Sequence, residues 1–277
     1  MSTRDFFDLR STHNPNRWYL EVTQGLSVGP PRNMFMFGGV GLAAAITAME
    51  GTTGRRVIWA AAQYLSFARP GSVVDFDVVV PVAGKYNTQA RVVAHVGDRE
   101  ILTANAALGE RPDELSAQWA TMPDVPAPEE CPPMPRRDRD DEELHDHLEL
   151  RVAKGRYGDA RRDGRLSADG EVYLWARPKD GRRINSGMLA IIADFIPSAV
   201  GNAIGQNAGG NSLDNTIRIR RIVPTEWVLC DTRIHGVHGG FAHGRMLQFA
   251  QTGELMATAS QSMILRIHDE LRTRETG

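Results

Sequence analysis

The chain has 277 residues, of which 42% are hydrophobic and 24% are charged, as in ordinary globular proteins. Its formal net charge of −2 argues against nucleic acid as the main partner, because phosphate binding needs a basic surface. The first residues are polar, and we expect no apolar run of the roughly 18 residues that a membrane span requires. Two cysteines, Cys131 and Cys230, provide no disulfide framework, so a cytoplasmic location is expected.

The first half of the chain predicts one helix followed by an antiparallel meander. A helix of small residues is expected from Phe37-Gly38-Gly39 to about Gly51, where glycine suits a C-terminal cap. Strand-like segments with glycine or proline turn signals follow it. They span residues 57–68, 72–83, 86–97 and 99–109.

A segment rich in proline and charge interrupts this pattern at residues 111–145. Such a composition is typical of a connection between two folded units, and it also fits an exposed loop within one domain. We therefore expect an N-terminal domain over residues 1–110, a linker over 111–145 and a C-terminal domain over 146–277.

The second half repeats the order of the first. A strand over 172–179 precedes a helix around 187–202, and four strand-like segments follow. The pattern predicts an α+β fold with two repeats of a helix wrapped by a curved antiparallel sheet. The four strand-like segments span residues 212–221, 226–237, 240–251 and 254–268.

The second helix contains one carboxylate in an otherwise apolar stretch, "GMLAIIADFIPSAVGN". Burying Asp194 without partners would cost several kcal/mol, roughly, so it either faces water or is surrounded by hydrogen-bond donors. Pro197 lies three residues further on and removes a backbone hydrogen bond from the helix. Periodicity alone does not decide between these two placements of Asp194.

Several familiar catalytic devices are missing from the sequence. It has no G-x-S-x-G elbow, no phosphate-binding P-loop and no C-x-x-C pair. His235, His238 and His243 border a glycine-rich hairpin, and we expect no metal site there. We expect no cofactor either. Arg218, Arg220 and Arg221 fit an exposed sheet face, with an anion site as the alternative.

Two neutral polar residues, Ser212 and Gln261, fall within strands that otherwise suit a half-buried sheet. A polar side chain on a buried face must be hydrogen-bonded. Considered alone, each fits a residue that satisfies its neighbours or faces water.

Several short motifs occur in a fixed order along the chain. The first half contains Phe37-Gly38-Gly39 and Tyr64-Leu65 followed by Arg69-Pro70-Gly71. The linker contains "MPDVPAPEE", and the second half contains "IIADF", "SLDNT" and "ATASQ". By the order and spacing of these motifs, from about Arg17 to Arg266, the chain resembles the TesB-like acyl-CoA thioesterase II family.

The resemblance implies a double hot-dog fold and hydrolysis of acyl-CoA thioesters to fatty acid and CoA without a covalent intermediate. It also implies that Asp194 activates a water held by Ser212 and Gln261, and that the chain forms a homo-oligomer, a dimer or tetramer. The sequence departs from the family pattern at four places. Serine replaces threonine at Ser212, asparagine replaces histidine at Asn215, Ser262 and Met263 replace an acidic residue and glycine, and Ser66-Phe67-Ala68 replaces a phenylalanine-leucine pair.

A non-catalytic acyl-CoA or lipid-binding protein with the same fold is the alternative, and the departures near Asn215 and Gln261 favour it slightly. A hot-dog hydratase is less compatible, because the sequence has no Gly-Asp-x-Asn-Pro-x-His element. No acidic residue occurs between Phe35 and Met49, and Ala106 aligns with Gln261 in the repeat. We therefore expect one active site per chain, on the second helix, with the first half contributing scaffold, and a wall of the substrate tunnel as a further contribution.

Overall fold

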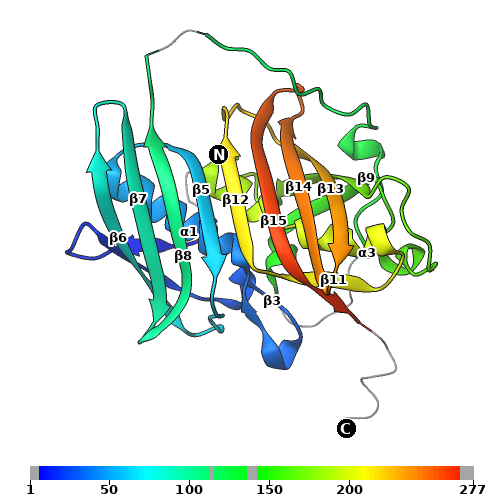
Figure 1. Ribbon diagram of the computed structural model, residues 1–277, viewed down its shortest axis with the longest axis horizontal. Helices are drawn as coiled ribbons and strands as arrows, with labels where there is room; N and C mark the ends of the chain where they lie inside the picture. Colours follow the sequence, from blue (N-terminus) through cyan, green and yellow to red (C-terminus); the bar gives the residue numbers. More distant parts are fainter. Residues whose placement is uncertain (1–5, 113–114, 136–141, 269–277) are drawn as a thin grey trace.

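The computed structural model describes residues 6–112, 115–135 and 142–268. One antiparallel sheet of 13 strands curves around a central pair of helices, and a separate two-stranded sheet joins β3 (Ser27–Val28) to β4 (Phe35–Met36). Figure 1 shows the sheet as one layer in front of the helices. The expected helix-and-sheet repeat is therefore confirmed.

The N-terminal half wraps six strands around α1 (Gly38–Thr53). The strand order is β1-β2-β6-β7-β8-β5, so β5 lies at the inner edge of this half. The two short strands at the outer edge were not expected from the sequence. The strands are β1 (Leu9–Ser11), β2 (Arg17–Glu21), β5 (Val57–Tyr64), β6 (Val73–Ala83), β7 (Asn87–Val96) and β8 (Arg99–Gly109).

Helix α1 is buried on nearly every side, which explains its small residues. It ends at Gly54, whose φ of 65° is left-handed, rather than at Gly51 as expected. Gly51 instead lies inside the helix, where a Cβ would come within 2.5 Å of the Trp18 ring. Close packing against Trp18 therefore explains the glycine at position 51, and Gly54 serves as the helix cap.

The C-terminal half places its strands in the order β12-β15-β14-β13-β10-β9, with β11 also paired to β15. The β13–β14 hairpin turns at Gly239 and Gly240, both with positive φ. Gly236 lies at a β-bulge in β13 instead of in the turn. The strands are β9 (Leu148–Lys154), β10 (Glu171–Pro178), β11 (Ala208–Ser212), β12 (Asp214–Ile219), β13 (Val228–His238), β14 (Phe241–Ala250) and β15 (Leu255–Ile267).

The second helix is broken where the sequence suggested one continuous element. Helix α2 (Ser186–Ala193) ends at Asp194, a 3-10 turn spans Ile196–Ala199, and α3 (Val200–Ile204) follows. Pro197 has no N–H to continue the α-helical pattern, so it sits in the first turn of the 3-10 segment. Asp194 is therefore a C-cap residue and does not lie in mid-helix.

One stretch, Ser186–Ile204, has the length and the apolar composition of a membrane-spanning helix, contrary to our expectation from the sequence. However, 78% of its most apolar window is buried inside the fold. Its apolar character reflects core packing between the two halves of the sheet.

The halves join through their central strands and helices. Strand β5 pairs with β12 in antiparallel register, with Ala61 opposite Thr216. The helices run in opposite directions, because Gly39 of α1 lies against Ile191 of α2 while Ser186 of α2 contacts Glu50 of α1. This arrangement approximates a twofold axis through the β5–β12 pair.

The segment after β8 crosses to the C-terminal half and packs on its edge (Figure 1). Gln118 bonds to the backbone of Gly253 and Leu255, and the Trp175 indole donates to the Pro126 carbonyl oxygen. The described parts of residues 111–145 thus behave as a strap on the second half, although the domain boundaries at 110 and 146 stay a prediction.

Candidate active site

Asp194 lies at the junction between the C-terminal end of α2 and the N-terminal end of α1. Its side chain is buried, with 4% of the residue exposed. The surface placement considered for this carboxylate is therefore wrong, and the hydrogen-bonded placement holds.

The structure brings the three predicted site residues together. The Ser212 hydroxyl, at the end of β11, donates to Asp194 Oδ1 at 3.1 Å, and Gln261 Nε2 of β15 donates to the same oxygen. Gln261 Nε2 also lies 2.6 Å from Ser212 Oγ. Pairing of β11 with β15, which sets Ser212 opposite Met263, aligns the hydroxyl and the carboxamide.

The first half supplies a third donor that the sequence did not identify. The backbone N–H of Gly39, in the first turn of α1, donates to Asp194 Oδ2 at 2.7 Å. A Cβ at Gly39 would lie 2.8 Å from the Ile191 carbonyl oxygen, so only glycine permits this approach. The N-terminus of a helix also favours a negative charge. The first half thus also supplies a hydrogen-bond donor to this carboxylate, and the Gly-Gly pair that opens the helix is the sequence signal for it.

Burial raises the pKa of Asp194 from 3.8 to about 6, against the opposing effect of Gln261, Gly39 and Ser212 and the smaller effect of the nearby Asn215 amide. The carboxylate therefore remains mostly ionised at pH 7, yet it is more basic than an ordinary aspartate. A pKa just below neutrality suits a group that takes a proton from water and returns it.

Two further residues border this cluster. Asn215 of β12 is fully buried, and the Tyr64 side chain at the end of β5 carries a buried hydroxyl. Tyr64 reaches the site because its N–H bonds to the Leu213 carbonyl oxygen, which extends the β5–β12 pairing. Within the described part of the chain, the Tyr64 hydroxyl, both polar atoms of Asn215 and Oε1 of Gln261 make no hydrogen bond of normal geometry. Asn215 nevertheless lies close to Tyr64 and to Asp194, because its amide lowers the pKa of both.

A second carboxylate lies at the opposite end of the helix pair. Glu50, in the last turn of α1, accepts hydrogen bonds from the Val57 N–H at 2.8 Å and the Ser186 hydroxyl at 2.9 Å. It lies one residue beyond the window in which the sequence showed no acid. This junction has no counterpart of the carboxamides, because Ala60 and Ala106 occupy the paired strand positions.

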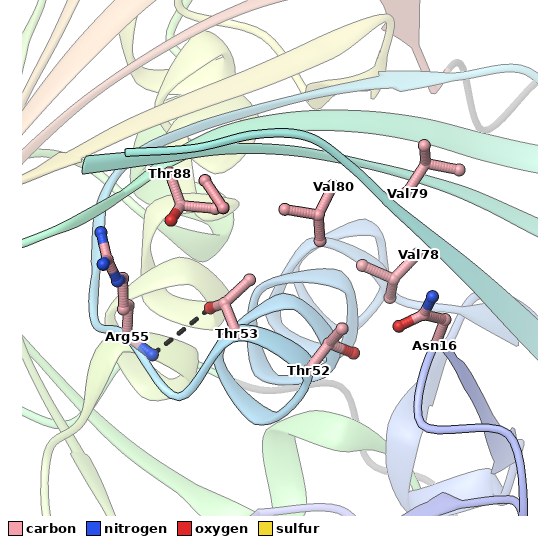
Figure 2. A pocket seen from close by; sticks show the side chains of 9 residues that line it. Asn16, Thr52, Thr53, Arg55, Val78, Val79, Val80 and Thr88 are labelled. Carbon is pink, nitrogen blue, oxygen red and sulfur yellow. Dashed lines mark hydrogen bonds between the residues drawn. The ribbon is translucent and has the colours of Figure 1, made fainter. Parts of the chain in front are cut away.

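A hollow of about 570 Å³ opens at the same end of α1, away from Asp194. Figure 2 shows Thr52 and Thr53 of α1 and Arg55 on one side of it, facing Val78 and Val80 of β6. Arg55 bonds to Thr53 and to the Lys85 carbonyl oxygen. The hollow therefore does not border the predicted site residues.

The other candidate clusters have ordinary contacts. His235, His238 and His243 are exposed on the β13–β14 hairpin, where His243 contacts the Ser262 hydroxyl. Arg220 and Arg221 both approach Glu254, and Arg220 also donates to the Ala117 carbonyl oxygen. These arginines hold the strap and the β14–β15 turn, so their contacts favour the structural interpretation over an anion site.

Comparison with known proteins places this geometry in a family. Residues 128–265 match the acyl-CoA thioesterase C-terminal domain. A crystal structure of a protein assigned as a thioesterase, from Novosphingobium aromaticivorans, shares 36% identity, with a TM-score of 0.84 over 93% of this chain and 98% of that one. A comparison with curated proteins finds no match.

More distant structures show the fold alone. A hot-dog protein from Alicyclobacillus acidocaldarius has 19% identity and a TM-score of 0.81, covering 95% of this chain and 97% of its own. The acyl-CoA thioesterase II of Mycobacterium marinum has 20% identity and a TM-score of 0.72 over 95% of this chain and 97% of its own. The double hot-dog fold expected from the sequence is confirmed, and the chain belongs to the TesB-like acyl-CoA thioesterase II family of thioester hydrolases.

Proposed function

We propose that the enzyme hydrolyses acyl-CoA by direct attack of a water molecule that Asp194 activates, without a covalent intermediate. The observation that carries this proposal is the set of contacts around one buried carboxylate. Asp194 Oδ1 accepts from both Ser212 and Gln261, whereas Oδ2 accepts from Gly39.

A carboxylate oxygen has two lone-pair positions, so Oδ2 retains one for the proton of a water molecule. Gly38 keeps this position clear, because a Cβ there would lie 2.8 Å from Oδ2. The unpartnered Oε1 of Gln261 is an acceptor for the second proton of the same water. The three residues then fix the direction of the attacking oxygen, which is the main benefit of such positioning.

In the proposed reaction, the water oxygen attacks the thioester carbonyl carbon while its proton moves to Asp194 Oδ2. The tetrahedral intermediate collapses, the carbon–sulfur bond breaks, and the CoA thiolate takes the proton from Asp194. The products are the free acid and the CoA thiol, and the carboxylate is restored. A base of pKa about 6 can both accept and return this proton near neutral pH.

Turnover of CoA esters tests the function directly. We expect release of free CoA from short-chain or long-chain acyl-CoA, detected with a thiol reagent. A protein that binds these esters without releasing CoA would instead be the non-catalytic binder considered from the sequence.

A single turnover with excess enzyme in H₂¹⁸O tests the route of attack. Direct attack by water places ¹⁸O in the product acid and leaves Asp194 unlabelled. Label on Asp194 would show that an acyl-aspartyl anhydride forms first, and would contradict the proposal.

Two finer features of the enzyme belong to this proposal. We expect a homo-oligomer, a dimer or tetramer, because apolar side chains such as Ile58 and Val79 are exposed on the strands. Light scattering should give at least twice the chain mass of 30.5 kDa, and a monomer would contradict it.

A cytoplasmic location is supported by the free thiols of Cys131 and Cys230.

A further inference from the structure

The donors of the predicted trio are all directed at Asp194 or at one another. Ser212 Oγ donates to Asp194, Gln261 Nε2 contacts Asp194 and Ser212, and the Gly39 N–H donates to Oδ2. The following N–H groups of α1, on Val40 and Gly41, bond to the Phe37 carbonyl oxygen. Hydrolysis nevertheless develops a negative charge on the thioester oxygen, and this charge needs donors of its own.

Two buried donors next to Asp194 make no hydrogen bond of normal geometry within the described residues. They are the Tyr64 hydroxyl and the amide of Asn215, which has 0% exposure. Asn215 lies close enough to Tyr64 and Asp194 to lower the pKa of both, so the three groups converge on one place. Native proteins rarely leave buried donors without a well-formed hydrogen bond, and a carbonyl oxygen, which accepts two hydrogen bonds, would satisfy both.

The positions of the two donors match a substrate next to the attacking water. The Tyr64 ring edge lies 3.1 Å from the place of a Cβ on Gly38, and Asp194 Oδ2 lies 2.8 Å from the same point. Tyr64 and Oδ2 thus flank the space that the absent Cβ leaves. Asn215 follows on β12, the strand paired with β5.

Both groups also have the required protonation state. Burial, and next the charge of Asp194, raise the pKa of the Tyr64 phenol well above its usual value. The phenol therefore keeps its proton at neutral pH and acts as a donor. The Asn215 amide has no charge to lose and offers two N–H donors at any pH.

We propose that Tyr64 and Asn215 bind the carbonyl oxygen of the thioester and stabilise the oxyanion that forms when water attacks. This inference rests on the proposed water attack and adds the donors that the reaction requires. It also makes the active site a joint product of both halves, since Tyr64 belongs to the first half and Asn215 to the second. Strand pairing between β5 and β12 holds the two donors in register.

Removing either donor should slow the chemical step with little effect on substrate binding. Tyr64→Phe keeps the ring and deletes a hydroxyl without a well-formed hydrogen bond, so the melting temperature should not fall. We expect kcat to drop by about 100-fold, as for other oxyanion donors, with KM within a few-fold. Tyr173→Phe is the matched control, because its hydroxyl donates to Glu171 at 2.7 Å on β10 and should leave kcat unchanged.

Asn215 allows a second test in which the donor is first removed and then restored. Asn215→Leu, or Asn215→Ala if leucine does not fit, removes both polar atoms and should lower kcat by about 100-fold. Asn215→His supplies a ring N–H at the same position and should recover much of this loss. If Asn215 had a purely structural role, the variants would have a lower melting temperature, and kcat would not differ between Asn215→Leu and Asn215→His.

Infrared spectroscopy reads the hydrogen bonds to the carbonyl group itself. In the Asp194→Asn background, bound acyl-CoA labelled with ¹³C at the thioester carbonyl should show a C=O band shifted to lower frequency. Tyr64→Phe and Asn215→Leu should each remove part of the shift, and Tyr173→Phe should remove none.

The outcomes separate the two proposals. If the wild-type enzyme turns over and both donor variants keep kcat within twofold and the full band shift, the oxyanion assignment is overturned while the thioesterase function stands. If the wild-type enzyme releases no CoA from any ester, the proposed function fails and this assignment falls with it.

Discussion

The two ends of the central helix pair have the same plan and different chemistry. At one end, Asp194 after α2 faces the first turn of α1 and accepts from Gly39. At the other end, Glu50 in the last turn of α1 accepts from Ser186 in the first turn of α2. A twofold axis through the Ala61–Thr216 pair relates the two junctions.

The strand residues around the two carboxylates explain the difference. The axis exchanges Ser212, Asn215 and Gln261 with Val57, Ala60 and Ala106. Glu50 accordingly receives a backbone N–H where Asp194 receives a hydroxyl and a carboxamide. The fold supplies a carboxylate at a helix N-terminus twice, and only the Asp194 junction has polar side chains at these strand positions, which is why we propose the reaction there.

Loss of the groups that hold the water should have the largest effects on activity. We expect Ser212→Ala and Gln261→Ala each to lower kcat by about 100-fold, since a misdirected water reacts slowly. The double variant should lose less than the product of the two, because both side chains hold the same water. Steady-state kinetics measures this, and fully multiplicative losses would contradict a shared water.

Adding one methyl group at the glycine in the first turn of each helix should lower activity at only one of the two junctions. Gly38→Ala would place a Cβ 2.8 Å from Asp194 Oδ2, so it should displace the water and lower kcat by about 10- to 100-fold. Gly187→Ala meets its nearest atom at 3.5 Å and should keep full activity. The same kinetic assay compares them, and equal activity would show that Oδ2 is not the reacting oxygen.

The pH dependence of activity should follow the Asp194 carboxylate. The base is active when ionised, so kcat/KM should fall about tenfold per pH unit below its pKa of about 6 and level off above it. Tyr64 keeps its proton through this range and adds no second inflection there. A profile that is flat from pH 5 to 8 would exclude Asp194 as the base.

The last expected effect concerns stability: Asp194→Asn should increase the unfolding free energy although it lowers activity. The folded-state pKa of Asp194 is raised, so its carboxyl favours folding below pH 4 and loses this contribution as the pH rises through about 6. Asp194→Asn should therefore gain up to about 3 kcal/mol of unfolding free energy relative to the wild type between pH 4 and 8. Urea unfolding at both pH values checks it, and a constant difference would contradict the shifted pKa.

Much of the fold could be predicted from the sequence, because the hydrophobic periodicity of the segments indicates their type and glycine or proline residues mark their ends. The three strands from Val73 to Gly109 alternate in burial and end at turn residues, so their expected limits are within one residue of those observed. The strand expected over 57–68 ends earlier, at Tyr64. The break after Asp194 was less predictable: Pro197 signalled it, but the apolar run suggested continuity. Short edge strands such as Leu9–Ser11 have too few residues for a periodic signal.

The candidate site likewise has residues that could be predicted from the sequence and residues that could not. Asp194, Ser212 and Gln261 came from the family resemblance and lie together, since each is a polar residue in an apolar element. Gly39 and Tyr64 were missed as parts of the site. Their contributions, a backbone N–H and a buried hydroxyl, depend on the contact between halves more than 100 residues apart in sequence.

Isosteric replacement of the two carboxylates tests the central claim most directly. Asp194→Asn and Glu50→Gln each remove one charge at equivalent ends of the helix pair. For Asp194→Asn, the amide oxygen can accept from Gly39, and the nitrogen that replaces Oδ1 can donate to the Ser212 hydroxyl oxygen once the Gln261 carboxamide flips, so the fold should persist. For Glu50→Gln, the amide oxygen can accept from the Val57 N–H and the nitrogen can donate to the Ser186 hydroxyl oxygen, so the fold should persist there too.

Turnover of the same acyl-CoA by the two variants gives the decisive comparison. We expect Asp194→Asn to lose about 10²- to 10⁴-fold in kcat with unchanged melting temperature or a higher one, and Glu50→Gln to stay within twofold of the wild type. An active Asp194→Asn enzyme, or an equal loss from Glu50→Gln, would contradict a single catalytic junction built on Asp194.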